Sequence, residues 1–413
     1  MYKMQTFSSK VKGSVRISGS KNATLPIIVA ALLNKGRTYL KNIPKITDVD
    51  NLLAVIKKIG CRVKFKSHHV LIESDLKYQD LLFEELKKFR ASYYFMGLFL
   101  ALFKEVKIYA PGGCQIGNRP INYHLEGFKL AGVDVVEDNQ IVHLKANKLQ
   151  PFTYSLPKKS LGATVNLLLL ASKIDGISTI ENASTEPEVD DLINFMNFLN
   201  IKVIRFQNMI IIEGKKQINL NVSYSVMPDR IEAMTYLMLG VFSERIKIKQ
   251  INLLHLEKPL MLLKQSGLNC KFGRRQIIVY RSRLKPIQLI SGDYPEISTD
   301  QMPLFYPIYS RMEGVSYFTE MIFDNRFHVV KELQKTNADI IVIDKTVCIT
   351  GKNNLIGNDL VATDLRAAAS LLLEAIINGD STVTNLFYLE RGYDDIYNKL
   401  RKLGVVFKVI KRV

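Results

Sequence analysis

The feature that most constrains the fold is an internal repeat, which recurs six times along the chain with a spacing of 67 to 72 residues. Each copy has an apolar helical segment, an extended stretch and a second helical segment that ends at Gly or Asn before a strand. The six terminal residues are Gly60, Gly132, Asn200, Gly267, Asn337 and Gly404. Because Gly and Asn tolerate the left-handed conformation that closes a helix, the repeat predicts six such helix ends.

The first helical segment of each copy is apolar on nearly every side, which predicts helices enclosed by other elements. A period of this length exceeds the roughly 20–50 residues of solenoid repeats. We therefore expect an α/β protein of two domains with three similar units each. The expected domains are residues 21–228 and residues 1–20 plus 229–413, joined near residues 20 and 228, with the active site in the cleft between them.

Charge and hydropathy exclude several classes of protein. The net charge of +18 is compatible with nucleic-acid binding, but the lysines are spread along the chain and form no basic tail. The longest apolar run, residues 93–103, is too short to span a bilayer, which needs about 20 residues. The first residues lack the apolar core of a signal peptide. We predict a cytoplasmic protein with neither a nucleic-acid partner nor a membrane segment.

Cysteine and histidine spacing gives no metal signature. The four cysteines (Cys61, Cys114, Cys270 and Cys348) are far apart, and the six histidines form no paired spacing. Scattered cysteines without a secretion signal are typical of reduced thiols in the cytosol. We expect no metal site.

Two glycine-containing turns carry reactive or charged residues. In residues 18–23, Gly19 and Lys21 precede a helix, an arrangement that suits a phosphate, although a simple helix-start turn gives the same pattern. In residues 111–120, two glycines precede Cys114 and Arg119 follows it. The glycines let the thiol approach a ligand and the arginine favours a thiolate, although an inert loop cysteine remains the alternative.

Arginines and carboxylates also recur at the starts of helices. Three first helices are preceded by Asp229, by Thr299 and Asp300, or by Asp364 with Arg366, and an N-cap is the ordinary role of such residues. Equivalent positions of repeated units converge in space, and clustered guanidinium groups bind phosphate and carboxylate. We therefore expect one anion-binding cleft surrounded by Lys21, Arg119, Arg326, Arg366 and Arg391.

Nine segments form a recognisable set: SGSKNATLP, FRASYYFMG, PGGCQIGNRP, SLGAT, ENASTEPE, MPDRIEA, DNRF, ATDLRAA and RGYDDI. With them the chain resembles the UDP-N-acetylglucosamine 1-carboxyvinyltransferases, a family of enolpyruvyl transferases, from about residue 10 to the C-terminus. The combination of the cysteine loop with the first and last of these segments is specific, whereas any one alone is a modest signal. The resemblance implies the family fold, two inside-out α/β domains of three units each that close over the substrate.

The resemblance also implies a reaction. The enolpyruvyl group of phosphoenolpyruvate would pass to the 3′-hydroxyl of UDP-N-acetylglucosamine with release of phosphate, the first committed step of peptidoglycan synthesis. Cys114 matches the family's general acid, Asp300 its base, and Asp364 a residue that supports this chemistry. The resemblance also places Lys21 among the catalytic residues. No metal or organic cofactor is implied. Fosfomycin, which alkylates the family's cysteine, would label Cys114.

Two sets of substrate contacts follow from the same resemblance. Phosphoenolpyruvate would contact Lys21, Asn22, Arg119, Arg326, Arg366 and Arg391. The nucleotide sugar would contact Arg90, Arg119, Pro120, Ile121, Asn122, Tyr123, Lys158, Ser160, Leu161, Gly162, Asp300 and Ile322.

Two departures from the family pattern bear on the acceptor. Asn122 stands where the family usually has Asp, and residues 294–302 differ from the usual sequence around the retained Asp300. A related enzyme acting on another acceptor therefore stays open, although the shikimate-pathway enzyme lacks the cysteine loop. A non-catalytic binding protein would be expected to have lost Cys114, Asp300 or an arginine. Oligomeric state is left open, a monomer included.

Overall fold

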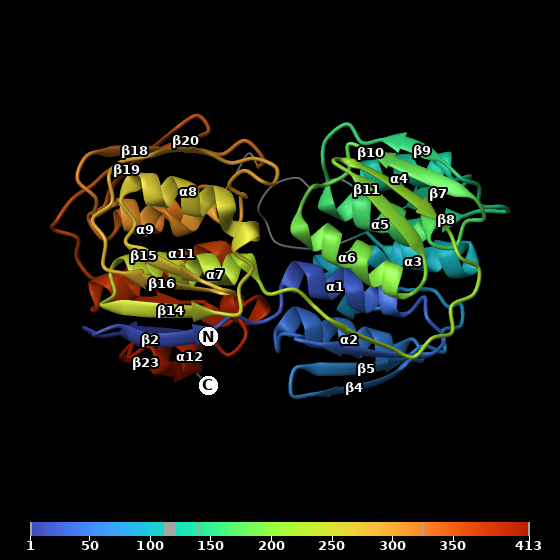
Figure 1. Cartoon of the computed structure of the whole chain (residues 1–413), viewed down its shortest axis with the longest axis horizontal. Coiled ribbons are helices and arrows are strands. Elements are labelled where there is room, and N and C mark those ends of the chain that lie inside the picture. Colours follow the sequence, from blue (N-terminus) through green and yellow to red (C-terminus); the bar gives the residue numbers. More distant parts are fainter. Residues whose placement is uncertain (1, 111–120, 139, 324–325, 412–413) are drawn as a thin grey trace. The chain divides into compact units, whose positions relative to one another are not determined.

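The computed structural model describes residues 2–110, 121–138, 140–323 and 326–411. These residues form two compact units, each with its own buried apolar core. The terminal domain comprises residues 2–18 and 228–411, and the central domain comprises residues 19–110 and 121–227. In the colours of Figure 1, the terminal domain contains the first blue segment and the yellow-to-red part of the chain.

One strand pattern recurs in both domains. In five four-stranded sheets an edge strand runs parallel to its neighbour, and the other pairs are antiparallel. The sixth sheet has three strands, and an isolated parallel bridge from Leu81 to Ile108 lies where the others have a fourth strand. Six sheets of common pattern, three in each domain, confirm the repeated α/β architecture.

The strands of the central domain form three sheets. Their orders are β13 (Val222–Ser225), β3 (Arg37–Lys41), β5 (His69–Glu73), β4 (Arg62–Lys66); β9 (Thr153–Ser155), β10 (Ile177–Glu181), β12 (Met209–Glu213), β11 (Lys202–Phe206); and β6 (Glu105–Tyr109), β8 (Ile141–Lys145), β7 (Asp134–Asp138).

The terminal domain has the other three sheets. Their orders are β2 (Lys12–Arg16), β14 (Arg245–Lys249), β16 (Gln276–Tyr280), β15 (Cys270–Gly273); β17 (Gln288–Ile290), β18 (Val315–Thr319), β20 (Thr346–Thr350), β19 (Asp339–Ile343); and β21 (Asp359–Val361), β22 (Thr382–Thr384), β1 (Tyr2–Thr6), β23 (Phe407–Lys411).

The sixth unit is completed by the start of the chain. In the other four-stranded sheets the last two strands are a local hairpin, such as β11 and β12. Here β23 pairs instead with β1, with Lys3 opposite Ile410 and Thr6 opposite Phe407. The first and last described strands therefore belong to one sheet.

Helices fill the interior of each domain, with the sheets at its periphery (Figure 1). The first helices are almost wholly buried, and every residue of α7 is buried. They are α1 (Lys21–Ala31), α3 (Tyr94–Phe103), α5 (Leu161–Ala171), α7 (Arg230–Val241), α9 (Tyr306–Tyr309) and α11 (Leu365–Asn378). The second helices, one per unit, are α2 (Thr47–Lys58), α4 (Asn122–Leu130), α6 (Pro187–Phe198), α8 (Glu257–Ser266), α10 (His328–Gln334) and α12 (Ile396–Lys402). Short 3₁₀ helices are η1 (Glu84–Lys88), η2 (Arg90–Tyr93), η3 (Leu253–Leu256), η4 (Met302–Leu304) and η5 (Leu386–Arg391). This arrangement confirms the inside-out α/β fold.

The predicted ends of the second helices are confirmed by backbone conformation. All six terminal residues have positive φ, between 60° at Asn200 and 113° at Gly267. One first helix departs from expectation, because residues 300–310 form η4 and the four-residue α9 rather than one continuous helix. Pro303 and Pro307 account for the break, since proline cannot donate an intrahelical hydrogen bond.

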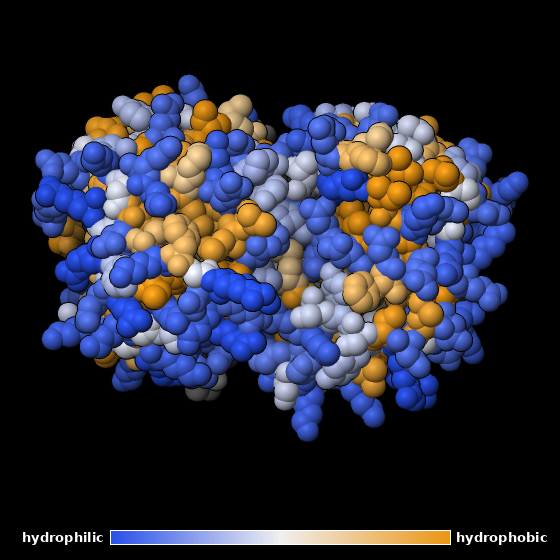
Figure 2. All heavy atoms as spheres, in the orientation of Figure 1, coloured by the Kyte–Doolittle hydropathy of each residue, from blue (hydrophilic) through white to orange (hydrophobic). Residues whose placement is uncertain are grey.

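The molecular surface is largely polar. The face shown in Figure 2 is mainly hydrophilic, with smaller hydrophobic areas over both domains. No helix in the described part of the chain has the length and apolar character needed to cross a membrane.

Candidate active site

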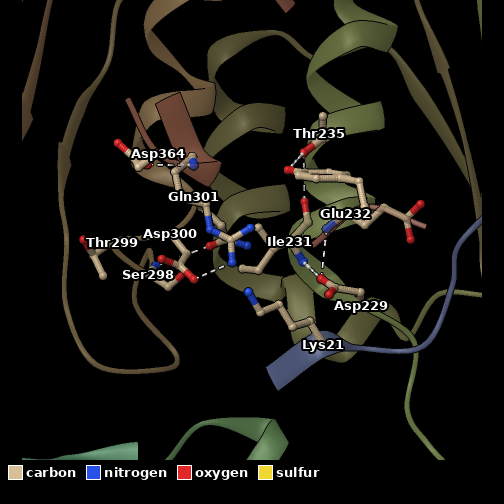
Figure 3. Close-up of polar contacts among 12 residues, drawn as sticks. Lys21, Asp229, Ile231, Glu232, Thr235, Ser298, Thr299, Asp300, Gln301 and Asp364 are labelled. Atoms are coloured by element: carbon tan, nitrogen blue, oxygen red, sulfur yellow. Dashed lines mark hydrogen bonds and ion pairs between the residues drawn. The ribbon is translucent and has the colours of Figure 1, made fainter. Parts of the chain in front are cut away.

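Asp300 of the terminal domain lies between two arginines. Its Oδ1 accepts from Arg326 Nη2 at 2.6 Å, and its Oδ2 accepts from Arg366 Nη2 at 2.6 Å. Arg326 Nη1 also donates to Thr299 Oγ1 at 2.7 Å. Asp300 retains 25% of its side-chain exposure, whereas the two guanidinium groups are buried. We call Thr299, Asp300, Arg326 and Arg366 the Asp300 cluster, part of which is seen in Figure 3.

The arginines dominate the electrostatics of this cluster. Burial alone would raise the pKa of Asp300, but the Arg366 and Arg326 guanidinium groups hold that pKa well below its usual range. In this arrangement Asp300 is an ionised carboxylate with little tendency to take a proton. An incoming anion that drew hydrogen bonds from either arginine would make it more basic.

The helix-capping role predicted as the alternative applies to two of the three acidic motifs. Asp229 Oδ1 accepts from the backbone N–H groups of Ile231 and Glu232, and so caps α7 (Figure 3). Asp364 Oδ1 accepts from the backbone of Arg366 at 2.8 Å and so caps α11. Both oxygens of Asp300 instead accept hydrogen bonds from arginine side chains. Asp364 thereby fixes the start of the helix that carries Arg366.

Two further predicted residues belong to the terminal domain. Arg391 is the last residue of η5 and is half-buried. Nearby in sequence, the Tyr393 hydroxyl is hydrogen bonded to Thr235 Oγ1 of α7 at 2.8 Å. Ile322 is exposed, and its backbone N–H donates to Glu320 Oε1 at 2.8 Å.

Lys21 and Asn22 begin α1 of the central domain. Lys21 Nζ lies 2.6 Å from Asp48 Oδ2, in the first turn of α2, and both side chains are largely buried. The motif that contains Lys21 is divided between the domains at residues 18 and 19. Ser18 is held in the terminal domain, where its hydroxyl donates to Asp394 Oδ2 at 2.9 Å and accepts from Lys399.

Predicted nucleotide-sugar residues converge around Tyr93 in the central domain. The Arg90 guanidinium lies 5.4 Å from the centroid of the Tyr93 ring. A Cβ on Gly162, at the start of α5, would lie 2.7 Å from the Tyr93 hydroxyl oxygen. The ring also contacts His124 of α4 edge-on, with the centroids 5.1 Å apart. We call Arg90, Tyr93, His124 and Gly162 the Tyr93 cluster.

His124 is neutral. Burial, followed by the charge of Arg90, lowers its pKa to about 3. Its Nδ1 lies 2.8 Å from Asn166 Nδ2, which can only donate, so the imidazole proton resides on Nε2. Asn166 Oδ1 in turn accepts from the backbone of Gly97 at 2.9 Å. This buried chain links α3, α4 and α5.

The other predicted contacts of the central domain lie at the same helix starts. Ser160 caps α5 by accepting from the backbone of Ala163 at 3.3 Å, and Leu161 is the first residue of that helix. Ile121 and Tyr123 are half-buried at the start of α4. Asn122 and Lys158 are exposed.

Cys114, Arg119 and Pro120 lie outside the described residues. The three cysteines that the structure describes are free thiols. Burial raises the pKa of Cys61 and of Cys270, which disfavours the reactive thiolate at both. Among the described residues, no three or more His, Cys, Asp or Glu side chains are grouped so as to hold a metal ion.

Two buried polar residues that bond to members of these clusters were not predicted from the sequence. Glu320 accepts from Thr299 Oγ1 at 2.7 Å, and Asn166 bonds His124. An acid directly after the extended pattern of β18 and an asparagine inside an apolar helix are unusual, and these sequence signals could have identified both residues. Their partners, more than 20 residues away in sequence, carry no local signal.

The fold is that of known enolpyruvyl transferases. The enolpyruvyl transferase NikO from Streptomyces tendae matches with a TM-score of 0.90 over 99% of this chain and 98% of that chain, at 22% identity. An EPSP synthase structure from Acinetobacter baumannii matches with a TM-score of 0.78 over the whole of both chains, at 16% identity. At these identities the likeness shows the fold alone.

Sequence relatives define the family more narrowly. The family model described as EPSP synthase (3-phosphoshikimate 1-carboxyvinyltransferase) matches residues 6–400. Curated proteins called UDP-N-acetylglucosamine 1-carboxyvinyltransferase are 37% identical in Halothermothrix orenii and 36% identical in Thermotoga petrophila, each over 97% of both chains. The chain therefore belongs to the enolpyruvyl transferase family that includes these two kinds of carboxyvinyltransferase.

Proposed function

We propose that this protein transfers the enolpyruvyl group of phosphoenolpyruvate to the 3′-hydroxyl of UDP-N-acetylglucosamine, with release of phosphate. The observation that carries the proposal is the identity of 32–37% over about 97% of the chain to relatives that bear the name of this activity. The step would serve peptidoglycan synthesis in the cytoplasm.

The chemistry needs an acid and a base. Cys114 would protonate the methylene carbon of phosphoenolpyruvate while the sugar hydroxyl adds to the neighbouring carbon, and Asp300 would take the hydroxyl proton. Elimination of phosphate with loss of a methyl proton then gives the enol ether. Asp364, as the cap of α11, would support this chemistry by fixing Arg366.

Cations would hold the phosphate and carboxylate of phosphoenolpyruvate. Lys21, Asn22, Arg119, Arg326, Arg366 and Arg391 are the proposed contacts, so residues of both domains would take part. When the substrate's anionic groups take hydrogen bonds from Arg326 or Arg366, the positive potential at Asp300 falls and its pKa rises towards that of a working base. The described ion pairs support this coupling between substrate binding and basicity.

The nucleotide sugar would lie on the remaining predicted residues. The Tyr93 cluster supports this assignment, because Arg90 and Gly162 contact one ring although they are 72 positions apart. The other proposed contacts are Arg119, Pro120, Ile121, Asn122, Tyr123, Lys158, Ser160, Leu161, Asp300 and Ile322.

Phosphate release from phosphoenolpyruvate across a panel of acceptors tests the proposal. We expect turnover with UDP-N-acetylglucosamine and little with shikimate 3-phosphate or with nucleotides that lack the sugar. Turnover with a different nucleotide sugar alone would favour the second candidate, an enolpyruvyl transferase of altered acceptor choice. Asn122 and residues 294–302 are the observations in favour of that candidate. Mass spectrometry after fosfomycin treatment checks Cys114, because Cys114→Ser should abolish the adduct.

A further inference from the structure

Glu320 lies directly after β18 and is 1% exposed, yet its carboxylate accepts four hydrogen bonds. Oε1 accepts from Ser291 Oγ at 2.7 Å and from the backbone of Ile322 at 2.8 Å and Phe323 at 3.3 Å. Oε2 accepts from Thr299 Oγ1 at 2.7 Å. A buried carboxylate with this many donors is fixed in position.

The donor and the acceptor of each hydrogen bond between Glu320 and Asp300 are fixed by the chemistry of the groups. An ionised carboxylate can only accept and a guanidinium can only donate. The single proton of the Thr299 hydroxyl therefore points to Glu320, which leaves an oxygen lone pair for Arg326 Nη1 at 2.7 Å. Arg326 Nη2 then donates to Asp300 Oδ1 at 2.6 Å. Each group in this chain is oriented by the one before it.

We propose that Glu320 is a positioning residue for the reaction: through Thr299 it orients the Arg326 guanidinium against Asp300. This inference rests on the proposed function. Without the fixed Thr299 acceptor, Arg326 loses one of its two described hydrogen-bond acceptors and turns away from Asp300. The carboxylate is then less strongly held as an anion, and its position relative to the sugar hydroxyl is less defined.

Glu320 also anchors the segment that departs from the family pattern. Ser291 lies shortly before this segment, residues 294–302, and Thr299 lies within it, and both donate to Glu320. Ile322, a proposed sugar contact, is bound through its backbone to the same carboxylate. One side chain thus ties the proposed base to the altered acceptor segment.

Three substitutions test the chain of hydrogen bonds. Thr299→Val keeps the shape of the side chain but removes the hydroxyl, and Glu320→Gln keeps the size but removes one acceptor oxygen. Each should lower kcat about ten- to hundredfold, as expected for a misplaced catalytic group. Each should also move the acid limb of the kcat–pH profile to higher pH. Thr299→Ser, which retains the hydroxyl, should restore both to near wild-type values.

The double variant Glu320→Gln with Thr299→Val tests whether Glu320 acts on Asp300 through Thr299, which we call a relay, or whether the two residues act independently. In a relay the second substitution adds little, whereas independent effects multiply. Glu374→Gln is the matched control, because Glu374 is equally buried in the same domain but pairs with Arg311, at 2.7 Å. It should lower thermal stability and leave the pH profile unchanged. Multiplicative effects, or a Glu320→Gln enzyme with a wild-type pH profile, would overturn the inference.

A measurement without turnover distinguishes failure of this inference from failure of the proposed function. If the wild-type protein releases no phosphate with UDP-N-acetylglucosamine, the proposed function fails. Carboxyl ¹³C NMR titration, with the Asp300 signal assigned by its loss in Asp300→Asn, still measures the pKa of Asp300 and so tests the relay. A raised Asp300 pKa in Glu320→Gln supports the relay, and an unchanged pKa refutes it.

Discussion

The Asp300 cluster and the Tyr93 cluster hold arginine in different ways. In the first, two buried guanidinium groups contact one carboxylate directly. In the second, Arg90 lies over an aromatic ring, and the adjacent His124 is neutral. Full charges at close range respond strongly to a new anion, whereas a cation over a ring beside a neutral histidine responds weakly. The difference suits the first cluster to charge-separating chemistry and the second to recognition.

Among the substitutions in the two clusters, Asp300→Asn should lower turnover most. Loss of a general base lowers turnover by about 10²–10⁴-fold, so kcat for phosphate release should fall within that range. Asp339→Asn is the control, because Asp339 is a more exposed carboxylate of the same domain, 3.5 Å from Lys352. A kcat within threefold of wild type would remove Asp300 from the chemistry.

Arg391→Ala should separate the two substrates. We expect the KM for phosphoenolpyruvate to rise about 30-fold, or roughly 2 kcal/mol of lost binding, with little change for the nucleotide sugar. Steady-state kinetics with each substrate varied in turn measures this. Arg401→Ala removes an arginine that lies over Phe407 and should change neither KM. Equal increases in both KM values for Arg391→Ala would contradict the proposed clamp.

Gly162→Ala addresses the Tyr93 cluster. The added methyl would lie 2.7 Å from the Tyr93 hydroxyl oxygen, so the ring must shift together with its contact to Arg90. The KM for the nucleotide sugar should rise about tenfold and that for phosphoenolpyruvate should not, corresponding to about 1.4 kcal/mol. Gly240→Ala is the matched control, because its added Cβ would lie equally close to a neighbour, 2.8 Å from the Val279 side chain. If it raised the same KM, the effect would be one of general packing.

His124→Gln should change how stability depends on pH. The folded pKa of about 3 lies below the ordinary 6.5, so the unfolded chain binds the proton more readily between these values. The histidine's contribution is therefore complete above about pH 6.5 and is lost as the pH falls towards 3, by at most about 1.4 kcal/mol per pH unit. Urea unfolding of both proteins from pH 4 to 7 should show a shallower slope for the variant. Parallel slopes would mean that His124 titrates normally.

Local chemistry explains which features could be predicted from the sequence. The six helix ends were predictable because a positive φ restricts the residue type at the position itself, as at Gly60 and Asn200. Capping by Asp229 and Asp364 follows from the same kind of local rule. The interrupted helix after Asp300 could also have been inferred, since Pro303 and Pro307 are visible in the sequence.

Contacts between distant residues could not be predicted in this way. The pairing of Lys21 with Asp48, and that of Glu320 with Thr299, depend on how separate elements pack. The resemblance supplied candidates for the groups that would contact substrate, but not for the residues that would orient them. Positioning residues act through geometry, which no short motif encodes.

The pairing of β1 with β23 imposes an order on folding during synthesis of the chain. The central domain is encoded by one continuous stretch, so it can fold as soon as it leaves the ribosome. Residues 2–6 must wait until their partner strand, near the end of the chain, has been translated. At about 5–20 residues per second, the nascent terminal strand stays unpaired for roughly 20–80 seconds, a period in which chaperones have access to it.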